Sequence, residues 1–358
     1  MSNIVSHWPR KMIRLLIALT LVLAACGSDE ATDTSQSDGA DAAESDGADA
    51  SESEAPEELT TITMGIASKS AFYLPELVAI DQGYFTDEGL ELSLQVGAPP
   101  SLAAAAISGE IPYNNAVPSA LQSVISGATP LRGYFFTYGV PMFDLYAQKD
   151  IESFEQLSGG TISVTAPNSA DQYVATNIMG ARGEDADSVT FVAGGPTANR
   201  WGALQSGAVQ GAMLSPPFAQ LADEAGFVRL GSGLELEPVG GAGIFMDPGY
   251  AADHTSDLKG SIRALLRAMD FIRENPDDTI ALLERELEID PAVSKATYDV
   301  VVASMTEDGK LSHENLDQQI ADIKRVTSSD SDLMASDVAD YQLLDEVLEE
   351  SAGDTAEG

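Results

Sequence analysis

The chain has 358 residues, of which 57 are acidic and 18 basic, so that its formal net charge is −39. This charge excludes nucleic acid as a partner, because polyanions are bound through lysine and arginine. Hydrophobic residues make up 44% of the chain, which is enough for a sizeable core. The single cysteine, Cys26, excludes an internal disulfide and a cysteine-based metal cluster.

The first residues have the layout of an export signal. Arg10, Lys11 and Arg14 form a positive region, and 15–23 is an apolar run too short for a membrane span. The following Leu-Ala-Ala-Cys, ending at Cys26, resembles the lipobox of bacterial lipoproteins. This resemblance implies acylation of Cys26, with chains such as palmitate, and anchoring on the outer face of the bacterial cell membrane. A plain secretory peptide with an incidental cysteine is the alternative.

Residues 26–58 predict an acidic, disordered tether. They contain about a dozen acids and no base, and their few apolar side chains cannot offset the entropy of ordering the chain. Repulsion between like charges would extend the segment. An acidic interaction tail is the alternative. About 300 residues then remain for the body, a length at which chains usually divide into two domains.

Strand-like and helix-like patterns alternate through the first part of the body. Apolar and polar residues alternate in the strand-like segments, and apolar residues recur at helical spacing in the others. Strands separated by helices imply a mostly parallel, wound sheet. The predicted strands are 60–66, 90–96, 131–137 and 142–148, and the predicted helices begin near Leu74 (ending at Gly83) and at Leu102 (ending at Ser108).

One pattern occurs twice, at 108–118 and at 206–216. Each copy has a helix that ends in Ser-Gly, a short β-branched run, and then a proline. Glycine suits the left-handed residue that ends a helix, and proline suits the first turn of the next one. The repeated helix–strand–helix–strand order predicts two similar α/β lobes.

The second half repeats the alternation and ends in helices. Predicted segments are the strands 161–165, 189–192, 227–231 and 244–246 and the helices 153–157, 171–181 and 198–205, with helices from Asp257 onward that pack on the first lobe. The predicted organisation is 1–25 signal peptide, 26–58 tether, 59–155 first part of lobe 1, 156–240 lobe 2, 241–346 return strand and C-terminal helices of lobe 1, and 347–358 a frayed tail.

Several stretches carry a family pattern. Residues 81–90 read DQGYFTDEGL, 157–162 read LSGGTI, 203–209 read ALQSGAV, and 274–278 read ENPDD. In combination they resemble the substrate-binding lipoproteins of ABC transporters, in the group that binds sulfonates, taurine, nitrate and thiamine pyrimidines. The resemblance covers about Thr61–Leu348. Pro112 and Gln210 depart from it, because the family usually has aspartate at these two places.

The resemblance implies a fold and a function. The expected fold class is α/β: a two-lobed periplasmic-binding-protein fold of type II, with wound sheets and a helical C-terminal segment on lobe 1. The lobes would close on a hinge over a small organic ligand. A monomer of this kind would hand its ligand to an ABC permease and ATPase, without a cofactor.

Ligands of open α/β sheets bind at the carboxyl ends of strands, in the loops that begin helices. Hydroxyl and amide side chains at such places are also ordinary helix caps. Bases are scarce there, and Arg132 and Arg200 are expected to pair with surface acids, so a neutral or singly charged ligand with an aromatic or apolar part is favoured. The candidate ligand-binding residues are Ser68, Lys69, Ser70, Tyr73, Asn114, Asn115, Tyr138, Asn168, Ser169, Gly195, Thr197, Trp201, Ser215 and Pro216.

Enzymatic activity is not expected. His254 and His313 both fall in the C-terminal region, so the sequence offers no Ser-His-Asp arrangement and no histidine-rich metal set. An enzyme on the same fold remains an alternative, as does a receptor that presents its ligand to a signalling partner, because a fold alone does not fix a function.

Overall fold

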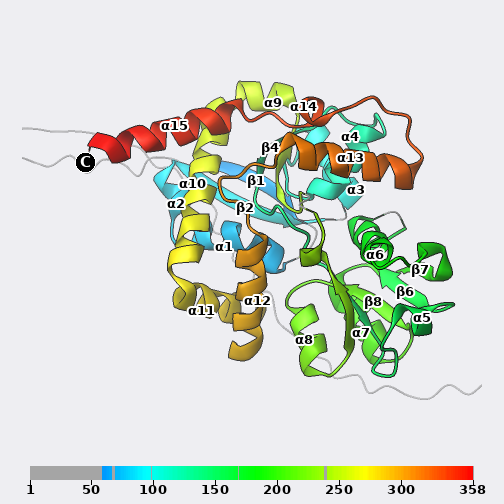
Figure 1. Cartoon of the computed structure of the whole chain (residues 1–358). Coiled ribbons are helices and arrows are strands. Elements are labelled where there is room, and N and C mark those ends of the chain that lie inside the picture. Colours follow the sequence, from blue (N-terminus) through cyan, green and yellow to red (C-terminus); the bar gives the residue numbers. More distant parts are fainter. Residues whose placement is uncertain (1–58, 67–68, 98, 168, 238–239, 358) are drawn as a thin grey trace, which may run out of the picture. The chain divides into compact units, whose positions relative to one another are not determined.

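Two five-stranded sheets organise the residues that the computed structural model describes, which are 59–357 except 67–68, 98, 168 and 238–239 (Figure 1). The predicted signal peptide, lipidation site and tether lie outside these residues. The first sheet has the order β2-β1-β3-β10-β4 and the second the order β7-β6-β8-β5-β9. The α/β fold class with a helical C-terminal segment is confirmed.

The first sheet is built from both ends of the body. Its strands are β1 (Thr60–Ile66), β2 (Leu90–Val96), β3 (Tyr113–Asn114), β4 (Arg132–Phe136) and β10 (Gly243–Met246). β1 runs parallel to β2 and β3, whereas β10 is antiparallel to β3 and β4. The sheet is therefore mixed, and the prediction of a mostly parallel sheet is wrong for this inserted strand.

The second sheet has the same design. Its strands are β5 (Asp144–Ala147), β6 (Thr161–Val164), β7 (Thr190–Ala193), β8 (Gly211–Leu214) and β9 (Val228–Ser232). Here β5 is the inserted strand, antiparallel to β8 and β9. The predicted boundary between 155 and 156 assigned this strand to lobe 1, and the strand pairing corrects that assignment. The chain thus passes between the sheets twice, between β4 and β5 and between β9 and β10.

The doubled Ser-Gly pattern has the predicted structure in both copies. Gly109 and Gly207 have φ values of +74° and +73°, the left-handed conformation that glycine adopts without strain. The first copy joins helix α3 (Pro99–Ser108) to β3 and α4 (Val117–Ile125), and the second joins α7 (Thr197–Gln205) to β8 and α8 (Phe218–Glu224). The central strands of the two sheets, β3 and β8, therefore belong to equivalent helix–strand–helix units.

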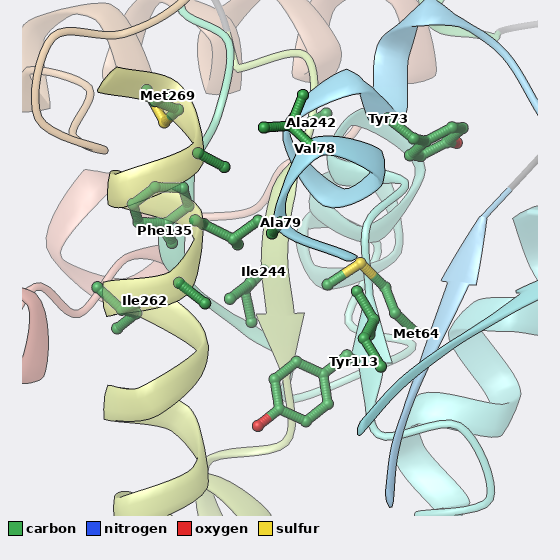
Figure 2. Close-up of a cluster of buried hydrophobic side chains, with 14 of the residues drawn as sticks. Met64, Tyr73, Val78, Ala79, Tyr113, Phe135, Ala242, Ile244, Ile262 and Met269 are labelled. Atoms are coloured by element: carbon green, nitrogen blue, oxygen red, sulfur yellow. The ribbon is translucent and has the colours of Figure 1, made fainter. Parts of the chain in front are cut away.

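Helices cover both faces of the first sheet. Neighbouring residues of a strand point to opposite faces, so apolar side chains on each face need a covering layer. Phe135 belongs to the core formed with α1 (Leu74–Asp81) and α10 (Thr255–Glu274), and Phe136 belongs to the core formed with α4 and α13 (His313–Thr327). Figure 2 shows side chains of α1, α10 and β10 meeting in the first of these cores. The other helical elements of this lobe are the 3₁₀ turn Ala71–Tyr73, α2 (Tyr84–Asp87), α9 (Pro248–Asp253), α11 (Pro276–Leu287), α12 (Pro291–Ser304), α14 (Ala335–Val338) and α15 (Gln342–Glu357).

The second sheet is likewise enclosed. Leu145 and Met213 pack against α5 (Phe154–Leu157) and α6 (Ala170–Ala181), while Tyr146 and Leu214 pack against α7 and α8. Short 3₁₀ turns at Ala186–Ser188 and Gly233–Glu235 complete the lobe.

Of the predicted frayed tail at 347–358, the described residues 347–357 are instead part of α15. Leu344 and Val347 are fully buried in the core that contains α10, and Lys259 of α10 forms ion pairs with Glu346 and Glu350. Apolar contacts and complementary charges therefore hold this helix (red in Figure 1) against the N-terminal part of α10. Within the described residues, no helix combines the length and the apolar character that crossing a membrane requires.

Candidate functional site

A cleft of about 640 Å³ is lined by loops of both lobes. This volume falls within the range of roughly 300–1,000 Å³ that is typical of small-molecule sites. The loops follow β1, β2 and β3 of the first sheet and β6, β7 and β8 of the second, which are the carboxyl ends of the strands. Phe143, Gly241 and Ala242, from the two segments that connect the sheets, also line the cleft.

Arg200 forms the polar part of the lobe 2 wall. Its side chain is 1% exposed, and its Nε donates a hydrogen bond to the Met213 carbonyl at 2.7 Å. Its Nη1 donates to Oγ1 of Thr165 and to the Gly195 carbonyl, and its Nη2 donates to Oγ1 of Thr197 at 2.8 Å. Most N–H groups of the guanidinium therefore donate to acceptors of the protein itself.

Asp171 is the counter-ion of Arg200. Its Oδ2 lies 3.4 Å from Nη1 of Arg200 and accepts a hydrogen bond from the Thr165 amide at 2.8 Å, while its Oδ1 accepts one from Oγ of Ser169 at 2.5 Å. Burial lowers the pKa of Arg200, and the charge of Asp171 acts against this shift. The ion pair therefore leaves the lobe 2 wall with little net charge.

Hydroxyl groups continue from Arg200 along this wall. Oγ1 of Thr197 accepts from Arg200 and lies 3.1 Å from Oγ of Ser215. With the arginine proton directed at Thr197, the threonine proton is available to Ser215, and the serine proton is available to a ligand. The wall can thus present a hydroxyl donor to an acceptor group.

A buried carboxyl lies behind the lobe 1 wall. Glu76, in the first turn of α1, is fully buried, and its Oε1 accepts a hydrogen bond of 2.6 Å from Nδ2 of Asn115, which lines the cleft. Burial raises the pKa of Glu76 to about 7, and hydrogen bonds from its own backbone amide and from Asn115 oppose the rise.

The rest of the cleft is mostly apolar. The rings of Phe72 and Phe143 pack against each other at a centroid distance of 5.2 Å, tilted by 41°, and both line the cleft. Tyr73, Val96 and Pro118 add further apolar surface from lobe 1. Such a site suits a ligand with a flat or apolar body and a few polar groups.

The structure brings seven of the candidate residues together in this lining, from five different loops. They are Ser70, Tyr73, Asn115, Ser169, Gly195, Thr197 and Ser215. Two other candidates, Ser68 and Asn168, lie outside the described residues.

Five candidate residues lie outside the cleft lining, each with another role. Lys69 pairs with Glu286 at 2.8 Å on the surface, and Oδ1 of Asn114 accepts from the Ala116 amide. The hydroxyl of Tyr138 donates to the Ala71 carbonyl within the core. Trp201 packs against Phe227 in the core between the second sheet and helices α7 and α8, and Pro216, joined by a cis peptide bond to Pro217, is buried.

Sequence reasoning missed Arg200, Asp171, Phe72 and Phe143. Arg200 was expected to pair with surface acids, and this prediction is wrong, whereas Arg132 does pair with Asp340 at the surface. One signal was available for Arg200: Gly194 precedes its helix, and a side chain there would collide with the arginine stem. Among the described residues, no group of three or more His, Cys, Asp or Glu side chains could hold a metal ion.

Two hydrogen bonds join the lobes at one edge of the cleft region. The hydroxyl of Tyr173, on α6, donates to Oδ2 of Asp322, on α13. Nearby, Nη2 of Arg325 donates to Oδ1 of Asn177 at 3.3 Å. Because α6 belongs to the second lobe and α13 to the first, these contacts exist only while the lobes stay together.

Two mixed α/β sheets with a ligand-sized cleft between their strand ends define the fold class of type II periplasmic binding proteins. The chain belongs to the family described as "NMT1/THI5 like", whose sequence profile matches residues 71–279, more than half of the chain. No curated protein matches the sequence.

Solved structures share this fold. The alkanesulfonate-binding protein SsuA from Xanthomonas axonopodis pv. citri, bound to MOPS, is 16% identical with a TM-score of 0.66, covering 79% of this chain and 99% of its own. The ligand-binding component of an ABC-type import system from Staphylococcus aureus is 11% identical with a TM-score of 0.67, covering 80% and 99%. The desulfurization enzyme DszB is 14% identical with a TM-score of 0.59, covering 82% and 99%. At these identities the likeness shows the fold and not the ligand.

Proposed function

We propose that this protein is an extracytoplasmic solute-binding lipoprotein that captures a small organic molecule in the cleft and delivers it to an ABC importer permease. One observation carries the proposal: the ligand-sized cleft has polar groups on walls that belong to different lobes, Asn115 on one and Thr197 with Ser215 on the other. A ligand that contacts both walls favours the closed state over the open one, which is how a two-lobed receptor reports occupancy.

The composition of the cleft supports a neutral or singly charged ligand with an aromatic or apolar part. Arg200 is compensated by Asp171 and occupied by protein acceptors, so it offers little charge to a dianion. The adjoining rings of Phe72 and Phe143 offer an aromatic surface for an apolar or flat part of the ligand.

Binding rather than catalysis is the function that the cleft supports best. Among the described residues, its lining contains neither histidine nor cysteine. The fold alone would also accommodate an enzyme, as the likeness to DszB illustrates. The cysteine of this chain lies in the lipobox-like segment at Cys26, where acylation would occupy it.

A ligand screen by thermal shift tests the proposal. Taurine, ethanesulfonate, nitrate, 4-amino-5-hydroxymethyl-2-methylpyrimidine, riboflavin and benzoate cover the expected chemistries. A ligand at one hundred times its Kd stabilises the native state by about 2.7 kcal/mol, which raises the melting temperature. Cells that lack the gene should then fail to take up the ligand found. Unchanged uptake, or chemical conversion of the ligand by the purified protein, would contradict the proposal.

A further inference from the structure

Glu76 is placed to control one wall of the cleft without touching a ligand. It is fully buried, and among the described residues it forms no ion pair. From another side chain it accepts a hydrogen bond of 2.6 Å, donated by Nδ2 of Asn115. Asn115 is 1% exposed and lines the cleft, so this asparagine stands between the acid and the space for a ligand.

The orientation of the Asn115 amide follows from its neighbours. Nδ2 points toward Oε1 of Glu76 and lies 3.4 Å from the sulfur of Met64, so both inward contacts are made by the donor end. The backbone of Asn115 is fixed as well, because its main-chain N–H donates to the Gly65 carbonyl at 3.2 Å. Oδ1 of Asn115 has no partner among the described residues although it is buried. A buried acceptor without a partner is unfavourable, and a ligand donor would satisfy it.

We propose that Glu76 is a positioning residue: it holds the Asn115 amide so that Oδ1 accepts a hydrogen bond from the ligand, and the cleft thereby selects molecules that carry an N–H or O–H donor at this end. This inference rests on the proposed function. The ligand class is organic amines, amides and amino-substituted heterocycles. The opposite wall complements this choice, because the Ser215 hydroxyl is available there to an acceptor group.

The protonation state of Glu76 determines how firmly the Asn115 side chain is held with its Oδ1 available to a ligand. Oε2 of Glu76 has no partner among the described residues. A proton on the carboxyl weakens the hydrogen bond that Oε1 accepts from Nδ2 of Asn115, whereas an ionised carboxylate accepts it more strongly and holds the amide in place. Since the pKa of Glu76 is about 7, donor ligands should bind more tightly as the pH rises through that value. Tyr138 is the other titratable group facing this acid, with Tyr73 beside it. Burial, Glu76 and Tyr73 raise the pKa of Tyr138 well above its ordinary value, so its phenol stays neutral.

Matched pairs of probes test the selection. Each pair has the same ring system with and without the donor: nicotinamide and methyl nicotinate, 4-aminopyrimidine and 4-methoxypyrimidine, indole and 1-methylindole. Affinities are measured by calorimetry on the full exported protein, at pH 6 and pH 8. The variants are Asn115→Leu, which removes the acceptor at similar size, and Glu76→Gln, which removes the ionisable group. Glu314→Gln, on the exposed first turn of α13, is the matched control.

The expected result is that donor members of bound pairs bind about tenfold tighter than their partners at pH 8, the effect of one good hydrogen bond. Asn115→Leu should abolish this preference, and Glu76→Gln should reduce it and remove its dependence on pH. Glu314→Gln should retain both. Binding without preference, or a preference unchanged in Asn115→Leu, overturns the inference while leaving solute binding intact.

The free protein gives a second measurement that needs no ligand and no Asn115 variant. The side-chain amide signals of Asn115 in ¹H–¹⁵N spectra should titrate with a midpoint near pH 7, and this titration should vanish in Glu76→Gln. If none of the six probes binds, the titration of the Asn115 signals decides whether Glu76 positions this side chain. Signals that do not change with pH in the unmodified protein would overturn the positioning role.

Discussion

The guanidinium of Arg200 and the carboxylate of Asp171 face each other 3.4 Å apart in the cleft wall, with each side chain 1% exposed. Their charges come from different helices of lobe 2, since Asp171 is in the first turn of α6 and Arg200 is on α7. Neither charge is tolerable there alone, because desolvation of an unpaired ion costs more than a folded protein can usually lose.

Asp171→Asn should therefore destabilise the protein strongly. It leaves the Arg200 charge buried without a counter-ion, which typically costs about 3–5 kcal/mol of the free energy of unfolding. Asp299→Asn is the matched control, because Asp299 pairs with Lys295 on an exposed helix face. Exposed pairs contribute about 0–1 kcal/mol. Urea unfolding monitored by circular dichroism measures both. Similar losses in the two variants would contradict the buried ion pair.

Tyr173→Phe should shift the lobes toward an open arrangement. The change deletes the hydrogen bond to Asp322 between α6 and α13 and keeps the ring. A hydrogen bond contributes about 1 kcal/mol, so the ratio of closed to open molecules should fall about fivefold. Small-angle X-ray scattering of the unliganded protein should show a larger radius of gyration. Tyr298→Phe, which removes a hydrogen bond to Ile272 inside lobe 1, should leave the scattering unchanged.

Glu76 should give stability an unusual dependence on pH. Its pKa is about 7 in the folded protein against an ordinary value of 4.5, because burial disfavours the charge. The folded state therefore binds more protons than the unfolded one between these values. Its contribution is fully present below pH 4.5 and is lost as the pH rises through 7. Glu76→Gln should flatten this fall, which amounts to about 3 kcal/mol.

Glu286→Gln serves as the contrasting variant in the same unfolding series. Lys69, and after it Arg285, hold the pKa of Glu286 below its ordinary value. Its contribution is therefore present above the unfolded pKa and is lost as the pH falls through the folded one. Glu76→Gln should remove a loss of stability that occurs as the pH rises, and Glu286→Gln should remove a loss that occurs as the pH falls. Effects in the same pH direction for both variants would contradict the assignment for Glu76.

Cys26→Ser should release the protein from membranes. The lipobox-like sequence predicts acylation at this cysteine, and stable anchoring needs the acyl chains. Radiolabelled palmitate should be incorporated into the unmodified protein and not into the variant, which should move to the soluble fraction. Ser28→Ala should stay membrane-bound. Continued anchoring of Cys26→Ser would refute the lipobox assignment.

The sequence predicted the strands with a clear alternation almost residue by residue. β1 and β2 begin and end at the predicted residues, and the left-handed glycines Gly109 and Gly207 were predicted from the repeated pattern. The inserted strands β5 and β10 were recognised as strands, but their direction and, for β5, its sheet were not predicted. A short, fully buried apolar run carries no sign of its partner or orientation.

About half of the candidate site could be predicted, and the reasons for the rest are physical. Loops at strand ends identified Asn115, Thr197 and Ser215. Tyr138 and Trp201 were misplaced, since composition does not show which face of an element an aromatic ring occupies. Arg200 was missed because charged residues are usually exposed, especially in a chain this acidic.

The position of β10 between β3 and β4 has a consequence for the folding of the newly made chain. Lobe 1 needs residues 243–246 between β3 and β4, and these are synthesised only after the whole of lobe 2. The second sheet is contiguous from β5 to β9 and can pair its strands as soon as it emerges. Residues 60–136 must wait, with unpaired strand edges, until the return strand arrives. If the chain is exported as proposed, this delay keeps its leading half from completing a folded lobe until the return strand has been made.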